Sequence, residues 1–207
     1  MTRPSPERRR LLAAALFGLA AAPLAAQAPD RADAPAPERD RRSRDWFTDT
    51  LLTDQDGQRQ RFYSDLLAPP QPRVTLLHSV FTSCSSACPL IVQRLLQLQG
   101  TLSGDMLREV VILSLSIDPL NDSPGRLKAF ALKHGADGPR WRFLTGAPIE
   151  VERVARRLGL WPAEPEAHQT TLIAGRASAG HWVKLRPDAP VPDLARQLQR
   201  FWPRPSG

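Results

Sequence analysis

Blocks of apolar residues alternate with polar stretches along most of this chain, and their spacing predicts both strands and helices. Two β-rich apolar runs, 74–81 and 110–117, have the length of strands that are buried on both faces. Residues 89–99 instead carry apolar side chains at helical spacing, and Pro89 suits the first turn of a helix. A strand, a helix and a second strand in this order indicate an α/β fold.

The elements after the second strand are recognised mainly by their ends. Helices are predicted at 124–134 and 149–158, because Gly135 and Gly159 follow directly on the apolar pattern of each. Two short strands joined by a Gly-containing turn then precede a last helix. Their ranges are 170–174, 181–185 and 191–201.

A hairpin is predicted near Leu52, because Asp56-Gly57 separates two short alternating runs. Residues 46–207 are numerous enough for one well-cored domain. We expect a central mixed sheet flanked by helices, with the hairpin as an N-terminal extension. Three aromatic residues are expected to fill the core or the edge of a site: Trp141, Phe143 and Trp161.

The first residues have the three-part layout of an export signal. Residues 1–10 are polar and Arg-rich, residues 11–24 are almost continuously apolar, and Ala-rich sequence follows. The arginines before Leu11 are similar to those of a twin-arginine signal. Because the apolar stretch is shorter than the roughly 20 residues of a spanning helix, a cleaved signal over 1–28 is predicted. An uncleaved membrane anchor is the alternative.

Pro, Ala, Arg and Asp dominate residues 29–45, which predicts a flexible spacer. In the whole chain, 28 Lys and Arg outnumber 21 Asp and Glu, for a net charge of +7. This balance permits contact with anionic lipid or an acidic protein. The basic residues do not form a run interleaved with aromatics, as a nucleic-acid groove requires, so no nucleic-acid partner is expected.

The two cysteines carry the sharpest chemical signal. Cys84 and Cys88, in the segment TSCSSACP, come at the transition from a strand to a helix. The positive end of a helix favours the thiolate, which is the form that binds metal or attacks a disulfide. If the segment is one helical turn, both sulfurs face the same side and can either form a disulfide or hold a soft ion such as Cu(I) or Zn(II). A pair of merely buried or oxidised cysteines is the alternative.

His168 is the candidate for a third ligand, because it follows the loop WPAEPEA and precedes a strand; otherwise it is an exposed loop histidine. His78 alternates onto the face of Leu76 and Val80, which favours a hydrogen-bonded core histidine. Asp118 ends the second strand, where we expect it to cap the following turn. His134 ends a predicted helix, where a capping role explains it. His181 begins a predicted strand and is most simply a surface residue.

Four segments resemble, in order, the Sco/SenC copper chaperones, which assist the assembly of cytochrome c oxidase. They are TSCSSACP, SIDPLNDSPGRLKAFA, WRFLTG and HQTTLIAGRASAGHWVKL, within residues 52–199. The resemblance implies a thioredoxin-like fold that carries Cu(I) or Cu(II) on Cys84, Cys88 and His168. Family members commonly have Pro-Asp between the cysteines and Asp before the histidine, where this chain has Ser85-Ser86 and Ala167.

The leading hypothesis is a periplasmic metallochaperone that turns over no substrate. It would work close to a membrane and pass copper to the copper subunit of cytochrome c oxidase or to another cuproprotein. The second hypothesis is a thiol-disulfide oxidoreductase that keeps a partner's cysteines reduced through Cys84 and Cys88. A thiol peroxidase using one low-pKa cysteine is the third and weakest.

Overall fold

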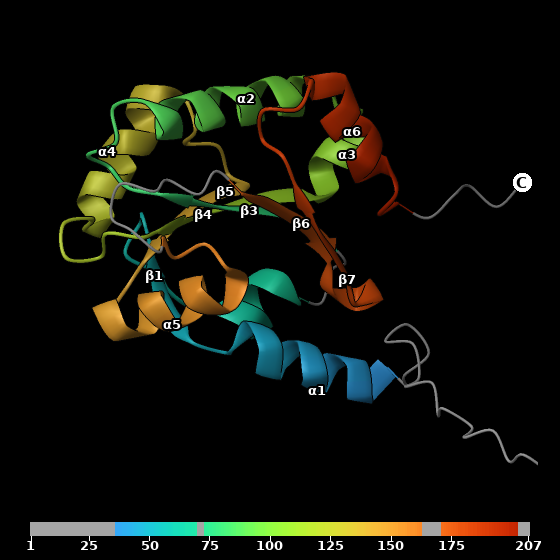
Figure 1. Cartoon of the computed structure of the whole chain (residues 1–207), viewed down its shortest axis with the longest axis horizontal. Coiled ribbons are helices and arrows are strands. Elements are labelled where there is room, and N and C mark those ends of the chain that lie inside the picture. Colours follow the sequence, from blue (N-terminus) through green and yellow to red (C-terminus); the bar gives the residue numbers. More distant parts are fainter. Residues whose placement is uncertain (1–35, 70–72, 163–170, 203–207) are drawn as a thin grey trace, which may run out of the picture.

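The computed structural model describes residues 36–69, 73–162 and 171–202, which form one sheet with helices on both faces (Figure 1). The sheet contains seven strands in the order β2-β1-β5-β4-β3-β6-β7. β3, β4 and β5 run parallel to one another, whereas the remaining neighbours pair antiparallel. The strands are β1 (Leu51–Asp54), β2 (Arg59–Arg61), β3 (Val74–Val80), β4 (Val110–Ser116), β5 (Trp141–Thr145), β6 (Leu172–Arg176) and β7 (His181–Leu185). The mixed α/β sheet expected from the sequence is confirmed.

The helices bury their apolar faces against the two sides of this sheet. One side is covered by α2 (Ala87–Thr101), α3 (Gly104–Glu109), α4 (Pro124–His134) and α6 (Val191–Gln199). The other side is covered by α1 (Ala36–Phe47), α5 (Pro148–Leu158) and the short π-helical segment η1 (Phe62–Leu67). Alternation along β4 supplies both cores, because Ile112 faces α2 while Val111 and Leu113 face α5.

The predicted ends of α4, at residues 124 and 134, are confirmed. Both ends are capped. The Ser123 hydroxyl accepts the N–H of Arg126, and Pro124 occupies the first turn. At the other end Gly135 has φ 70°, the left-handed conformation that a glycine adopts without a Cβ clash. Gly159 closes α5 in the same way, with φ 66°.

The strand β5 was not predicted, although its aromatic residues were correctly expected to be buried. Trp141 and Phe143 lie on the core face that is covered by α2 and α4. β5 pairs with β4 on one side and with β1 on the other. Its five residues are too few for a distinctive pattern, and its place in the sheet depends on partners far away in sequence.

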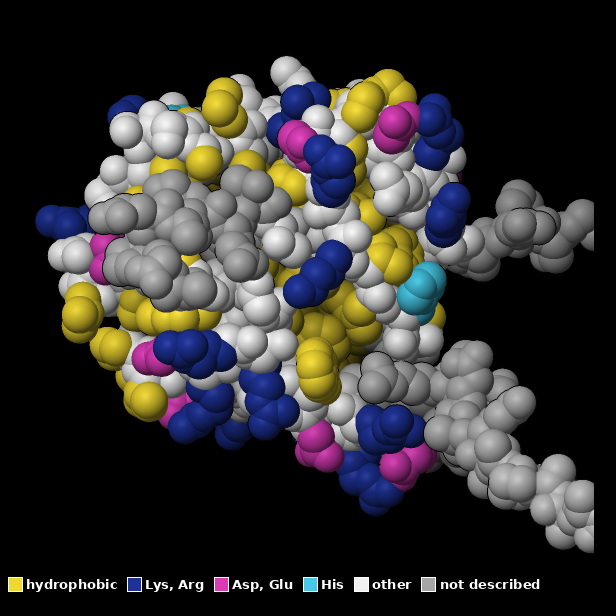
Figure 2. Space-filling model, in the orientation of Figure 1, with side chains coloured by type: hydrophobic (Ala, Val, Ile, Leu, Met, Phe, Trp, Pro, Cys, Tyr) yellow, Lys and Arg dark blue, Asp and Glu magenta, His cyan; other side chains and the backbone are white. Residues whose placement is uncertain are grey.

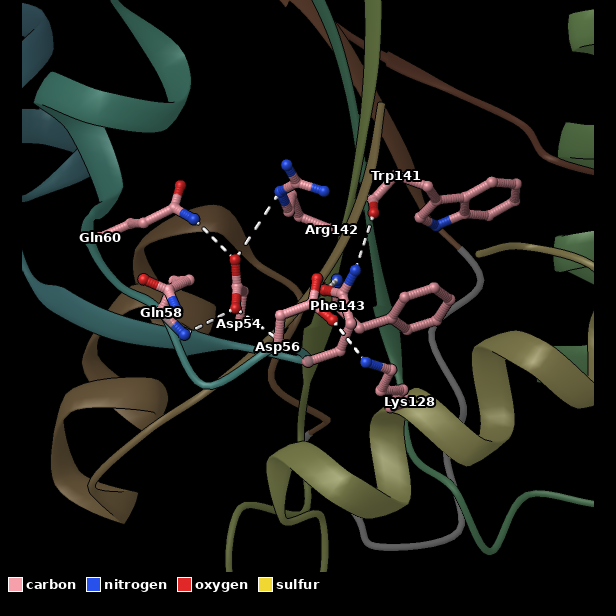
Figure 3. Close-up of polar contacts among 9 residues, drawn as sticks. Asp54, Asp56, Gln58, Gln60, Lys128, Trp141, Arg142 and Phe143 are labelled. Carbon is pink, nitrogen blue, oxygen red and sulfur yellow. Dashed lines mark hydrogen bonds and ion pairs between the residues drawn. The ribbon is translucent and has the colours of Figure 1, made fainter. Parts of the chain in front are cut away.

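The predicted hairpin forms, and it joins the sheet instead of standing outside it. The Gln55 side chain donates to the Trp141 carbonyl at 3.1 Å and accepts from the Phe143 N–H at 2.8 Å. Asp54 accepts the backbone N–H groups of Asp56 and Gln58 (Figure 3). These bonds fix the turn and extend the edge of β5. The second strand has three residues, because the chain turns helical at Phe62.

The predicted flexible spacer is wrong for residues 36–45, which belong to α1. This helix is held at its C-terminal end by Phe47, which is 3% exposed and packs against Trp182 with ring centroids 4.5 Å apart. The anchor lies just beyond the polar stretch, so composition within 29–45 could not reveal it. Residues 1–35, with the predicted signal, lie outside the described part of the chain, and none of the described helices is long and apolar enough to cross a bilayer.

Candidate copper and thiol site

Cys84 lies in the turn that connects β3 to α2, and Cys88 lies in the first turn of α2, at the carboxyl end of the parallel strands. The backbone N–H of Cys84 donates to the carbonyl of Phe81 at 3.1 Å, which closes the turn. Cys84 is 6% exposed and Cys88 is 5% exposed, and both are free thiols. Cys88 belongs to the first turn of α2, so the position expected from the sequence is confirmed.

Cys84 occupies the place where a capping side chain would normally accept hydrogen bonds. Ser86 is the N-cap residue of α2, yet its side chain makes no capping hydrogen bond. Instead, the Cys88 backbone N–H donates to the sulfur of Cys84 at 3.3 Å. Burial acts to raise the pKa of Cys84, but hydrogen bonds from Cys88 and from the N–H groups of Ser86 and Ala87 outweigh it, so the pKa is lowered.

The second thiol has the opposite character. Burial, the hydrogen bond to Cys84 and the charges of Cys84 and Asp122 raise the pKa of Cys88 to about 12. The pair therefore contains one sulfur that readily becomes a thiolate and one that keeps its proton until a stronger partner removes it. This asymmetry suits a nucleophile with a resolving thiol, and it equally suits a site that a metal ion completes by displacing a proton.

Asp122 connects the cysteine turn to the loop that follows β4, and sequence reasoning did not find this role. It is 1% exposed, and its carboxylate accepts the backbone N–H and the hydroxyl of Thr82 at 3.0 and 2.6 Å. Its second oxygen accepts the Ser116 hydroxyl at 2.6 Å. The only signal in the sequence was a second aspartate soon after a strand end. Asp118 behaves as expected, since its carboxylate accepts the Asn121 amide and so caps the turn.

His78 is a core residue, as expected, and both of its ring nitrogens are occupied. Nδ1 donates to the carbonyl of Ser79 at 2.9 Å, and Nε2 accepts the Ser114 hydroxyl at 2.7 Å. The Ser114 oxygen in turn accepts the indole N–H of Trp141 at 2.8 Å. Burial lowers the pKa of His78 to about 4, so the ring is neutral. It serves the core and is not directed toward the cysteines.

The third predicted ligand, His168, lies outside the described residues. Among residues 36–69, 73–162 and 171–202, no group of three or more His, Cys, Asp or Glu side chains is arranged to hold a metal ion. The remaining histidines agree with their predicted positions. His134 lies in the last turn of α4 with its ring against Phe130, and His181 is exposed at the start of β7.

A cleft of about 450 Å³ adjoins the cysteine turn. Phe81, Ser83 and Ile117 line it from the two strand ends, and Trp161 closes it from the end of α5. The guanidinium of Arg156 lies 5.6 Å from the centre of the Trp161 ring, which holds that ring in place. Trp161 therefore lies at the edge of the site, as the sequence suggested.

Comparison with known proteins agrees with this geometry. The SCO1/SenC family model matches residues 52–174. The chain is 37% identical over 83 residues to the SCO1 protein homolog of Bacillus subtilis strain 168, and the alignment covers 40% of this chain and 42% of that relative. This chain therefore matches less than half the length of that protein.

Solved structures share the fold. A SCO1/SenC family lipoprotein from Bacillus anthracis str. Ames is 26% identical with a TM-score of 0.59, over 73% of this chain and 91% of that one. BsSco, a member of the Sco family of cytochrome c oxidase assembly proteins with a disulfide switch, is 26% identical with a TM-score of 0.60, over 73% and 90%. Bradyrhizobium japonicum ScoI, solved with copper bound, is 20% identical with a TM-score of 0.56, over 74% and 97%.

Proposed function

This chain belongs to the SCO1/SenC family, and from that premise we propose that it is an exported copper-binding metallochaperone. It holds copper with Cys84, Cys88 and His168 and passes it to cytochrome c oxidase or to another cuproprotein. One observation carries the proposal: the turn after β3 presents two free thiols one helical turn apart, with the Cys88 N–H donating to the sulfur of Cys84.

The donor set fits copper in its reduced state. Thiolates are soft ligands that select Cu(I), and two thiolates with one imidazole complete a trigonal site. The hydrogen bonds at the start of α2 favour the thiolate of Cys84 before any metal arrives. Cys88 loses its proton only on binding, so copper uptake releases a proton and is pH-dependent.

Transfer requires that a ligand of the recipient reach copper held by nearly buried sulfurs. The cleft lined by Phe81, Ser83 and Trp161 opens beside the turn, at the residue before Cys84, and there we expect a recipient to approach. A recipient thiolate or imidazole entering there can replace one ligand at a time. Copper then moves by ligand exchange, and the chain itself is unchanged.

The test is an anaerobic titration of the reduced chain with Cu(I), run beside Cys84→Ser and His168→Ala. We expect one copper per chain and a loss of affinity in both variants. Because the two cysteine thiolates are soft ligands that favour Cu(I), Zn(II) in the same assay should bind more weakly. Copper binding that is indifferent to both substitutions would sink the proposal.

The second candidate, a thiol-disulfide oxidoreductase, is favoured by the opposite pKa shifts of the two thiols. The Cys84 thiolate attacks a disulfide of the partner, and one partner sulfur leaves as a thiolate that takes up a proton. Cys88 then loses its proton and attacks the sulfur of Cys84 in the mixed disulfide. The partner is left with two thiols, and this chain with a Cys84–Cys88 disulfide.

A Cys88→Ser variant separates the two candidates. If exchange is the function, this variant traps a partner as a stable mixed disulfide, and His168→Ala remains active. If copper transfer is the function, His168→Ala fails and no disulfide-linked partner accumulates.

The remaining parts of the proposal concern location. Residues 1–28 act as an export signal, which would serve as a membrane anchor if it were not cleaved. The domain over 46–207 works in the periplasm, near a membrane. Tagging the chain and following its N-terminal sequence after cell fractionation tests both points. An uncleaved chain in the cytoplasmic fraction would contradict them.

A further inference from the structure

The cleft between α1, α5 and β7 lies apart from the cysteine turn and measures about 740 Å³. Its apolar wall is formed by Phe47, Ile173 and Trp182, which belong to the core on the α5 side of the sheet. Figure 2 shows hydrophobic side chains exposed between Lys and Arg side chains in the part of the surface next to α1. The groove is therefore amphipathic, with an apolar floor and a charged rim.

The rim is strongly basic. Arg42 from α1, Arg156 and Arg157 from α5 and Lys184 from β7 line the groove, against the single carboxylate of Asp45. Arg156 is paired with Glu152 on its own helix at 2.6 Å. Within the described residues, the side chains of Arg42 and Lys184 make no hydrogen bond or ion pair, and both are exposed. Two positive charges from separate elements are thus available to an anionic ligand.

Trp46 adds a second feature of the same chemistry. It is 56% exposed on α1, beside the buried Phe47 that fixes the helix to the domain. The indole of tryptophan combines an apolar ring with a polar N–H, and tryptophan is therefore enriched at membrane–water interfaces. Lys and Arg side chains beside it can lay their apolar stems on the hydrocarbon while their charges meet phosphates.

The position of α1 in the chain agrees with this chemistry. The apolar stretch 11–24 ends twelve residues before Ala36, the first residue of α1. Even fully extended, that connection reaches only about 40 Å. In any form of the chain in which 11–24 stays in the bilayer, α1 and the groove remain close to the membrane.

We propose that this groove docks on the surface of an anionic phospholipid bilayer. Arg42, Arg157 and Lys184 meet headgroup phosphates, and Trp46 enters the interface. The cysteine turn lies at the carboxyl end of β3 and is not part of the groove. Arg156 lines both the groove and the cleft beside the turn, but the cysteines line neither. Docking through Arg42, Arg157 and Lys184 therefore does not involve the thiols, and it requires no copper.

The experiment uses residues 29–207, which retain both hydrophobic cores, since every buried core residue lies between Phe47 and Phe201. The reduced protein is mixed with vesicles of phosphatidylcholine alone or with about one third phosphatidylglycerol, and the bound fraction is measured by flotation. We expect binding only to the anionic vesicles, with loss of binding when salt shortens the Debye length. Equal binding to neutral vesicles, or none to either, overturns the proposal.

A matched pair of variants separates this groove from the general attraction of a basic protein. Arg42→Gln with Lys184→Gln should weaken vesicle binding by about tenfold or more. Lys133→Gln with Arg200→Gln removes the same charge from α4 and the end of α6, on the other side of the sheet, and should change it by less than about twofold. Equal losses in the two variants overturn the proposal.

Trp46 provides a readout that does not depend on charge. Quenching of tryptophan fluorescence by brominated lipid should be clearly reduced in Trp46→Phe, whereas the bound fraction stays within about threefold. Unchanged quenching would place another surface against the lipid and overturn the proposal. Since no arm of the experiment contains copper, a failure here is distinct from a failure of the proposed metallochaperone function.

Discussion

The backbone N–H of Cys88 donates to the sulfur of Cys84 at 3.3 Å, so one cysteine caps the helix on which the other lies. A helix start normally recruits a hydroxyl or carboxylate for this role. Here the acceptor is the sulfur itself, because Ser86 makes no capping bond. The sulfur that accepts this hydrogen bond is also the reactive atom. The start of α2 and the chemistry of the site therefore depend on the same two residues.

The two thiols should differ greatly in reactivity. At neutral pH we expect Cys84 to be alkylated by iodoacetamide more than about a hundredfold faster than Cys88, because its pKa is lowered while that of Cys88 is raised to about 12. Their exposed fractions, 6% and 5%, are too similar to explain a difference by access. Mass spectrometry of peptides from the unsubstituted, reduced chain after a brief exposure to iodoacetamide checks this, because both thiols then keep their mutual contacts. Similar rates for the two would contradict it.

Replacing Asp122 with Asn should lower the pKa of Cys88, because the Asp122 charge is one cause of its elevation. Once Cys84 is replaced, burial and Asp122 remain as causes that raise this pKa, so the decrease should be only part of the remaining shift, because burial is the larger of the two. Asn can keep the hydrogen bonds with Thr82 and Ser116, so the turn should persist. The absorbance of the thiolate against pH measures the change in a Cys84→Ser background. Asp118→Asn is the control and should leave the titration where it is.

His78 should make the fold sensitive to acid. Its pKa is about 4 in the folded chain and 6.5 when unperturbed. Between these two pH values the unfolded chain binds a proton at this residue and the folded chain does not. Stability is then lost as the pH falls, by about 2 kcal/mol between pH 7 and pH 4.5 from this residue. Urea unfolding at both pH values should show a smaller loss in His78→Gln. The exposed His181→Gln should lose as much as the parent chain; if His78→Gln does too, the assignment fails.

Gln55 should stabilise the hairpin against β5. Gln55→Ala leaves the Trp141 carbonyl and the Phe143 N–H without their partner, which should cost about 2 kcal/mol in the free energy of unfolding. Gln58→Ala is the matched control, because the bond that Gln58 makes to Asp54 comes from its backbone. Its cost should stay below about 0.5 kcal/mol. Equal effects of the two substitutions in urea unfolding would show that the amide of Gln55 does not hold the hairpin.

Local pattern was sufficient wherever the deciding interactions are local. The cap and the glycine fixed the ends of α4 because Ser123 and Gly135 act on their own helix. Alternation along β3 placed His78 on the core face, because side chains on a strand change sides at every residue. The cysteine spacing likewise placed both thiols at the start of a helix.

Other features were decided by residues far apart along the chain. β5 has five residues and takes its place only because β1 and β4 offer edges on both sides. The polar composition of residues 36–45 indicated a spacer, but these residues belong to α1. The contact that holds this helix is made by Phe47, just beyond the polar stretch, with the distant Trp182.

The sequence by itself determined the α/β class, the turn that bears Cys84 and Cys88, and the family to which the chain belongs. Only the tertiary structure decided that Asp122 would reach Thr82, 40 residues away, and that Arg42 and Lys184 would line one groove. The physical reason is that periodicity and caps act within a few residues, whereas a buried carboxylate or a shared rim exists only once distant segments have packed together.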